Sequence, residues 1–340
     1  MPDHKTDYAK KLEDLLITMP DFVSDFIYNF GQVDKYTTKI EYCRDIKMFL
    51  DYIVNYIPEH SDKDIKDLTL SDLENMETLD INRYLTILSG SKDNGLKNST
   101  LKRKRASLSS MYGFFMNTGK ILRNPIAATR RINLPEKNLI YLSNEEQTVL
   151  LNTIRYGTCL KDNVAKLHNK YAARDSAMFL LMLDTGLRVS EMLDTDISDY
   201  NLTDCSVVVN RKGGDVQMVY FSDECADYLE MYFDAQRTKY NLHDEEIPAF
   251  TTTSGKRLGV RAVEMLVKKY IAACIPEKAK VISPHKLRSS FAMSFYNASG
   301  NDILLLQKKL NHKNISTTNI YAKAADVAMR ESRGILQGKR

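Results

Sequence analysis

The sequence predicts a mainly helical protein with two domains, the second of which also contains a small antiparallel sheet. Apolar residues recur at intervals of three and four along much of the 340-residue chain, a spacing that gathers them on one face of a helix. A break with proline and polar residues lies near residues 132–142, and two short β-branched runs flank a Gly-Gly turn at residue 213. Such a pattern is typical of a hairpin. We therefore expect a helical domain at residues 1–135 and a mixed domain at residues 136–340.

Two helical patterns define the first domain, at residues 37–57 and at residues 98–119. In the second of these, Ser99 is the expected N-cap, because its hydroxyl can accept a hydrogen bond from the first turn. Gly119 is the expected stop, because glycine readily adopts the left-handed conformation that ends many helices. The expected buried stripe consists of Leu101, Leu108, Met111, Tyr112 and Phe115.

The second domain begins after Pro135, which cannot lie inside a helix. Ser143, followed by Glu145 and Glu146, predicts a new helix start. A strongly apolar segment at residues 172–186 ends on a Thr-Gly pair. Strands are expected at residues 205–210 and 216–221, and further helices at residues 223–240, 260–275 and 283–300.

Composition is that of a soluble globular protein, with 43% apolar and 27% charged residues. No run approaches the roughly 18 to 20 apolar residues of a membrane span, and the N-terminus lacks the apolar core of a secretory signal. The five cysteines are scattered, without a CxxC pair. This pattern favours reduced thiols and argues against a disulfide framework or a zinc site. We expect a cytoplasmic protein that does not associate with a membrane.

The net charge of +4 is unevenly distributed. Residues 1–96 hold 11 basic and 19 acidic side chains, whereas residues 97–137 hold ten basic side chains and Glu136 alone. Residues 256–288 hold nine basic side chains and two acidic ones. Two basic regions favour a polyanion held between two surfaces, although two solvated helix faces are the alternative. The candidate DNA contacts are Lys102, Arg103, Lys104, Arg105, Lys256 and Arg257. Of these, Lys102, Arg103 and Arg105 fall largely off the buried stripe.

Four short segments carry side chains suited to phosphodiester chemistry. TGLRVSE supplies Arg188, the Gly-rich turn supplies Lys212, HKLR supplies His285 and Arg288, and LNHKNISTTNIY supplies His312 and Tyr321. Each segment alone is more often structural, and their ordered occurrence in one chain is what points to a site. Arginine suits the non-bridging oxygens of a phosphate, because its planar fork donates two hydrogen bonds and stays protonated. Tyrosine suits the nucleophile, because a phenolate is also a fair leaving group.

In this order the four segments resemble the site of the tyrosine recombinase (phage-integrase-like) family. The resemblance covers both domains and is most specific in the last 60 residues. It implies a SAM-like core-binding domain followed by a catalytic domain, and a 3′-phosphotyrosyl intermediate formed by Tyr321. Two positions depart from the family's commonest pattern: Asn311 replaces a glycine, and Ser289 replaces a histidine.

The resemblance also implies roles for the other residues. Lys212 is the expected general acid, and a depressed pKa beside two arginines favours proton donation. His285 is the expected base and His312 the expected phosphate ligand, with the reverse split left open. Glu191, three residues after Arg188, either caps the helix locally or is the acidic residue that the family often has there. Neither ATP nor a metal or other cofactor is expected, because the bond energy is kept in the intermediate.

The expected partner is double-stranded DNA with inverted-repeat core sites. A homotetramer on DNA, a monomer in its absence, and an accessory or directionality factor are the expected assemblies. The C-terminal segment, with Ile335 and Leu336 as anchors, is expected to dock on a neighbouring protomer. Two alternatives remain: a type IB topoisomerase, and a non-catalytic DNA-binding protein on the same fold.

Overall fold

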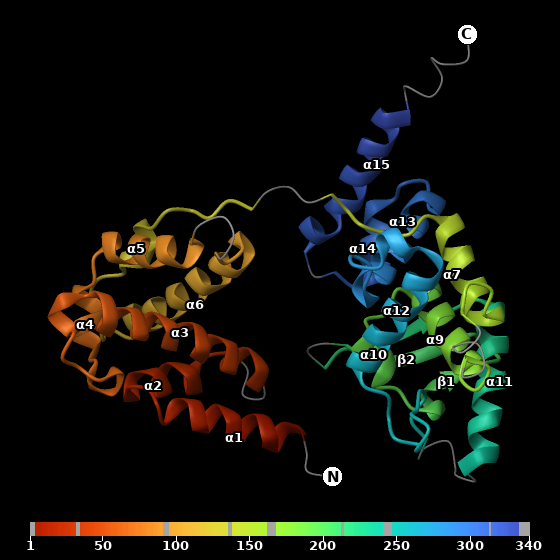
Figure 1. The fold of residues 1–340 in the computed structure, drawn as a ribbon, viewed down its shortest axis with the longest axis horizontal. Coiled ribbons are helices and arrows are strands. Elements are labelled where there is room, and N and C mark those ends of the chain that lie inside the picture. Colours follow the sequence, from red (N-terminus) through yellow and green to blue (C-terminus); the bar gives the residue numbers. More distant parts are fainter. Residues whose placement is uncertain are drawn as a thin grey trace. The chain divides into compact units, whose positions relative to one another are not determined.

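The computed structural model describes residues 4–31, 35–90, 95–134, 138–161, 168–211, 214–240, 247–312 and 314–332. The chain divides into two compact units, Met1–Glu136 and Lys137–Arg340 (Figure 1). This division lies one residue from the boundary that the sequence predicts. Ile335 and Leu336, predicted as anchors of a docking segment, lie outside the described residues.

The regular secondary structure of unit 1 is helical in all of its described residues. Long helix α3 packs against α1, α2 and α6, and α5 packs against α6. All five residues of the predicted α6 stripe are buried, and all but Leu101 belong to the core that these helices share, together with Phe26, Phe49 and Tyr84. The helices are α1 (His4–Leu16), α2 (Asp21–Asn29), α3 (Tyr36–Tyr56), α4 (Leu70–Asn75), α5 (Thr78–Ser89) and α6 (Asn98–Asn117).

The two ends of α6 test the predicted caps. Gly119 has φ +69°, so the predicted C-terminal stop is confirmed. The predicted N-cap, Ser99, is wrong. Helix α6 already begins at Asn98, and Lys97 is the N-cap residue, with no side-chain cap hydrogen bond. The carbonyl of Lys97 accepts hydrogen bonds from Thr100 and Leu101, so the N-cap lies two residues before the serine and the helix begins one residue before it.

Unit 2 combines helices with one three-stranded antiparallel sheet in the order β1-β2-β3. Strands β2 and β3 form the predicted hairpin, with Ser206 opposite Tyr220 and Asn210 opposite Val216. Strand β1 was not predicted, because it spans only two residues. The elements are α7 (Asn144–Tyr156), α9 (Ala172–Thr185), α10 (Val189–Leu193), β1 (Tyr200–Asn201), β2 (Ser206–Asn210), β3 (Val216–Tyr220), α11 (Asp223–Tyr240), α12 (Val260–Cys274), α13 (Pro284–Ala298), α14 (Ile303–Leu310) and α15 (Asn319–Ser332). In the part of the chain that is described, no helix has the length and apolar character that crossing a membrane requires.

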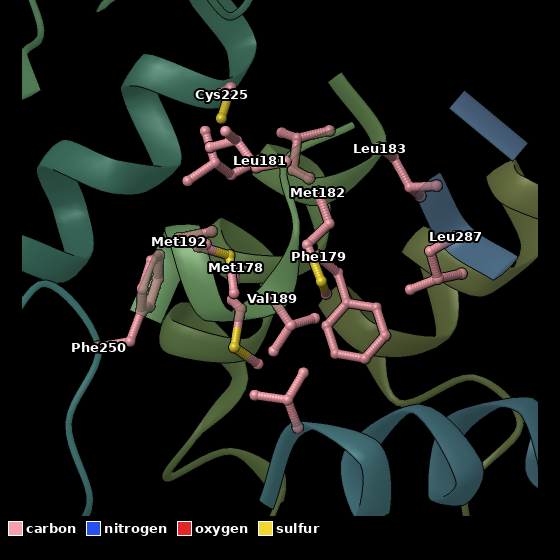
Figure 2. Packing of buried hydrophobic residues seen from close by; sticks show 14 of the residues in the cluster. Met178, Phe179, Leu181, Met182, Leu183, Val189, Met192, Cys225, Phe250 and Leu287 are labelled. Atoms are coloured by element: carbon pink, nitrogen blue, oxygen red, sulfur yellow. The ribbon is translucent and has the colours of Figure 1, made fainter. Parts of the chain in front are cut away.

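Helix α9 lies at the centre of unit 2, where it packs against α7, α11 and α13. Its side chains meet those of α10, α11 and α13 in one apolar cluster, which includes Phe179, Val189 and Leu287 (Figure 2). Most of α9 is buried, which is why its sequence is apolar on nearly every side. The core therefore fixes the C-terminal end of α9, from which the first candidate site residue follows.

Gly186 ends α9 and turns the chain toward that site. Its φ of +62° lies in the left-handed region, where a side chain is strained. A Cβ atom at this position would also lie 2.2 Å from Cδ1 of Phe291 on α13. Glycine is thus required here both by the backbone conformation and by the close approach of α13.

Candidate active site

Arg188 stands at the N-terminus of the short helix α10, two residues after Gly186. Glu191 completes a capping box with it: the backbone N–H of Arg188 donates to Glu191 Oε2 at 3.0 Å. The side chain adds a second contact, from Arg188 Nη1 to Glu191 Oε1 at 2.6 Å. The Arg188 side chain remains 43% exposed. This arrangement holds one guanidinium at the surface in a fixed orientation, with part of its donor set open to a ligand.

Arg288 lies on α13 and is 4% exposed. Its Nη1 donates to the carbonyl oxygen of Gly186 at 2.6 Å, and its Nη2 donates to that of Leu310 at 2.7 Å. Burial, followed by the charge of Arg188, lowers the pKa of Arg288 to about 10. Arg288 therefore joins the turn after α9 to the end of α14, in addition to bringing a positive charge to the site.

Glu191 is the carboxylate around which the arginines gather. Besides its contacts with Arg188, its Oε2 accepts from Arg211 Nη1 at 2.9 Å, and Arg288 Nη1 lies 4.0 Å away. Burial acts to raise the pKa of this carboxyl, but the hydrogen bonds from Arg188 and the charges of Arg211 and Arg188 hold it below its ordinary value. Glu191 is therefore an ionised carboxylate that caps α10 and binds two arginines. The local capping role is one of the two that its spacing from Arg188 predicted.

Sequence reasoning missed Arg211, which is 5% exposed at the end of β2. A signal was available. Val207 and Val209 face the core on alternate positions of this strand, and Arg211 is the next position on the same face. An arginine where the alternation demands a buried residue indicates a buried partner, and the structure supplies Glu191.

His312 follows the end of α14 and is held from both sides. Asn311, which replaces the family's usual glycine, has φ 49° and so adopts the left-handed conformation that asparagine tolerates best after glycine. The ring Nδ1 of His312 lies 3.0 Å from the hydroxyl of Thr318, a fully buried residue that the sequence did not single out as functional. Burial and the positive charges of Arg288, Arg188 and His285 lower the pKa of His312 to about 4. The imidazole is neutral at pH 7 as a result.

Tyr321 and His285 differ in their exposure. Tyr321, on α15, is 4% exposed and belongs to an apolar cluster with Phe291 and Leu310. Burial raises the pKa of its phenol, against the opposing effects of a hydrogen bond with Ser289 and the charge of Arg288. His285 is exposed near the start of α13. Partial burial and the charges of Lys286, Arg288 and Arg188 lower its pKa.

These interactions bring together five of the six predicted catalytic residues. They lie on separate segments of unit 2, and the charges of the arginines act on the histidines and on the tyrosine. The sixth, Lys212, lies outside the described residues. The turn beside it is framed by Arg211, whose N–H donates to the carbonyl of Asp215 at 2.7 Å and whose carbonyl accepts from Gly214 at 3.1 Å.

A hollow of about 450 Å³ borders the cluster between the start of β3 and α14. Asp215, Gln307 and His312 are among the residues that line it. Over the described ranges, no group of three His, Cys, Asp or Glu side chains is placed to hold a metal ion. The expectation of chemistry without a metal stays a prediction.

Comparison with known proteins gives this cluster its context. Residues 148–327, more than half of the chain, match the phage integrase family. The chain belongs to this family of tyrosine recombinases. The matched segment contains all six predicted catalytic residues.

Curated relatives of this phage integrase family member match it along nearly its whole length. The tyrosine recombinase XerC of Caldanaerobacter subterraneus subsp. tengcongensis is 29% identical over 326 residues, covering 92% of this chain and 86% of its own. The tyrosine recombinase XerS of Streptococcus agalactiae serotype III is 26% identical over 343 residues, covering 92% and 94%.

Solved structures with the same fold include two recombinases bound to DNA. The Tn1549 transposon integrase in complex with circular intermediate DNA has a TM-score of 0.65 at 18% identity, and the match covers 92% of this chain and 99% of that one. The XerH site-specific recombinase in its post-cleavage complex with difH has a TM-score of 0.62 at 20% identity, covering 86% and 77%. This chain therefore has the same fold as these solved recombinase and integrase structures.

The predicted DNA contacts of this tyrosine recombinase differ in how they are held. Lys102 and Lys256 are exposed.

The two arginines Arg105 and Arg257 are held by contacts within the protein. Arg105 is half-buried and donates to the Thr129 hydroxyl and the Ile126 carbonyl. Arg257 donates to the carbonyls of Leu193 and Thr195 at 2.6 Å and pairs with Asp196. The two lysines are therefore the best placed of these four to contact a phosphate.

Lys104 corrects the sequence prediction. It is 5% exposed, and its Nζ lies 2.8 Å from Oδ1 of Asp45, which is itself 1% exposed. Arg103 pairs with the other oxygen of Asp45 while its side chain remains 42% exposed. Lys104 therefore neutralises a buried carboxylate within unit 1 and is not available to DNA. The prediction failed because this partner lies 59 residues away in the sequence.

Proposed function

We propose that this protein is a site-specific DNA recombinase that cuts and rejoins DNA strands through a covalent bond between Tyr321 and a 3′ phosphate. The observation that carries the proposal is the gathering of Arg188, Arg211 and Arg288 around the buried carboxylate of Glu191. The charges of these arginines also act on His312, and that of Arg288 acts on Tyr321. A phosphodiester gains negative charge on its non-bridging oxygens during attack, and preorganised guanidinium groups stabilise that charge. Three arginines face a single glutamate here, which leaves an excess of positive charge for a phosphate to neutralise.

The first half of the reaction forms one bond and breaks one. Tyr321 Oη attacks phosphorus, and the bond between phosphorus and the 5′ oxygen breaks. The phenol proton passes to a histidine, and the ammonium proton of Lys212 passes to the leaving 5′ oxygen. In the second half, a 5′ hydroxyl of another strand attacks the phosphotyrosine and releases Tyr321. Neither half consumes ATP, because the phosphate ester is exchanged and not hydrolysed.

The lowered pKa values of the two histidines support their roles. A phenol whose pKa is raised by burial needs a base, and a histidine can accept its proton only while the imidazole is neutral. We assign the base to His285, whose side chain is exposed and whose pKa is lowered. His312 then donates a hydrogen bond to the phosphate from Nε2, with Thr318 holding Nδ1.

The DNA partner is proposed to carry inverted-repeat core sites, with Lys102 and Lys256 contacting its backbone. Four protomers acting on two such sites would exchange strands, with the C-terminal segment docking on a neighbour. The biological role is either integration and excision of a mobile element or resolution of chromosome or plasmid dimers. Relatives named XerC and XerS, and a transposon integrase of the same fold, support recombination in either setting.

The test is denaturing capture of covalent protein–DNA adducts from cells, with wild type compared with Tyr321→Phe and the trapped 3′ ends sequenced. Adducts with wild type alone, gathered at one short inverted repeat, are expected. The position of that repeat, at the ends of an element or at a single chromosomal or plasmid site, distinguishes the two roles. Adducts spread over many sequences indicate a type IB topoisomerase, and DNA binding without any adduct indicates a non-catalytic binder. Either result refutes the proposal.

A further inference from the structure

Arg211 is a buried charge that takes no direct part in the proposed bond exchange or proton transfers. Its side chain is 3% exposed, and its Nη1 donates to Glu191 Oε2 at 2.9 Å. Its Nε is buried without a hydrogen-bond partner among the described residues. Burying a guanidinium costs free energy even when it is paired, and replacing a buried ion pair by apolar side chains is often neutral or stabilising. Stability alone therefore gives a weak reason for an arginine at this position.

The backbone of Arg211 forms the base of the β2–β3 turn. Its N–H and its carbonyl make the two hydrogen bonds, with Asp215 and Gly214, that close the turn. Lys212 is the next residue in the chain. Any contact that fixes Arg211 therefore also fixes the point from which Lys212 departs.

Glu191 connects that turn to the loop of Arg188. One of its oxygens accepts from the backbone N–H of Arg188 and from Nη1 of Arg211, and the other accepts from Nη1 of Arg188. A carboxylate that accepts hydrogen bonds from two guanidinium groups is restricted in both position and orientation. Glu191 therefore holds the β2–β3 turn and the loop of Arg188 in a fixed relation, although they lie more than 20 residues apart in the sequence.

We propose that Arg211 is a positioning residue for strand cleavage: through Glu191 it sets the base of the β2–β3 turn, to which Lys212 is joined in the chain, relative to Arg188. The inference rests on the proposed function, because it assumes that Lys212 donates a proton to the leaving 5′ oxygen. Catalysis depends on holding a proton donor to within about half an ångström of its productive position beside the acceptor. Loss of the hydrogen bond between Arg211 and Glu191 is expected to weaken proton donation more than phosphate binding.

The test uses single-turnover cleavage by the full-length protein of the duplex recovered in the adduct capture, nicked so that cleavage cannot reverse. One form carries the natural 5′ oxygen at the scissile phosphate, and the other carries a bridging 5′ sulfur. A thiolate has a far lower pKa than an alkoxide and leaves without a proton donor. The ratio of the two rates therefore reports on the general acid, and a loss of folded protein does not change it.

Arg211→Met should slow cleavage of the oxygen substrate by about tenfold or more, since general acid catalysis contributes roughly 10²- to 10⁴-fold. Cleavage of the sulfur substrate should stay within about threefold of wild type. Lys212→Ala should give the same pattern more strongly. The matched control is Arg174→Met, which removes an 11%-exposed arginine paired with buried Asp175 on α9 and should leave the ratio unchanged.

Other outcomes overturn the inference in distinguishable ways. Equal slowing of both substrates by Arg211→Met means that Arg211 acts on the phosphate itself. Wild-type rates on both substrates mean that the contact with Glu191 is structural only. If wild type cleaves neither substrate, the proposed function has failed, and the inference fails with it.

Discussion

Replacing Lys104 by methionine should destabilise unit 1 and leave its interaction with DNA intact. Lys104 and Asp45 are 5% and 1% exposed, with 2.8 Å between Nζ and Oδ1. Breaking a buried ion pair by removing one partner costs roughly 3–5 kcal/mol, because the other charge stays buried. Since Arg103 remains on Asp45, we expect the lower end, about 3 kcal/mol. The double variant Lys104→Met/Asp45→Leu should recover most of this loss, because it leaves no charge buried.

The chain has no tryptophan, so hydrogen exchange of the amides in α3 and α6 is the suitable measure of stability. DNA binding is followed by anisotropy of a labelled random-sequence duplex over a series of salt concentrations. Exposed Lys102 is the comparison: Lys102→Met should reduce the slope of log K against log salt by about 0.9, the value for one phosphate contact. An equal change in slope with Lys104→Met, or unchanged exchange in α3 and α6, would refute the assignment of Lys104 to the core.

Two further predictions concern unit 2 and its site. Gly186→Ala should lower the free energy of unfolding by at least about 2 kcal/mol, from left-handed strain of about 1 kcal/mol and the close contact with Phe291. Gly119→Ala has the same strain with nothing within 4 Å and should cost about 1 kcal/mol; equal losses in thermal unfolding would contradict the packing argument. The pKa of His312 falls from 6.5 in the unfolded chain to about 4 in the folded one, so between these values the unfolded state binds more protons and stability decreases as pH decreases, by at most roughly 3 kcal/mol. Urea unfolding of His312→Gln should show a shallower loss between pH 6.5 and pH 4; a dependence as steep as that of wild type is the opposing result.

Local patterns in the sequence were enough for most of the fold. Helix α11 has the predicted bounds, Asp223–Tyr240, and the capping box of Ser143 with Glu146 starts α7 as expected. The alternating β2–β3 hairpin was also predicted. In each case the signal and the structure that it specifies lie within one helix or one strand pair, so no distant contact was needed to predict them.

Features that depend on distant contacts were not predictable in the same way. The burial of Lys104 depends on Asp45 in another helix, and the role of Arg211 depends on Glu191 in another turn. Thr318 was visible as part of a Thr-Thr pair, but its contact with His312 follows from the fold of the segment between them. Asn311 needs no distant contact to explain it. It replaces the family's usual glycine in a left-handed backbone conformation that asparagine also tolerates.

The most direct test of the account is identification of the atom that carries DNA in the trapped adduct. The covalent complex is digested with nuclease and protease, and the remaining nucleotide is located by mass spectrometry. The account predicts a single 3′-linked nucleotide on the phenol of Tyr321. A nucleotide on another residue, such as neighbouring Tyr296, or one linked through its 5′ phosphate, would contradict it.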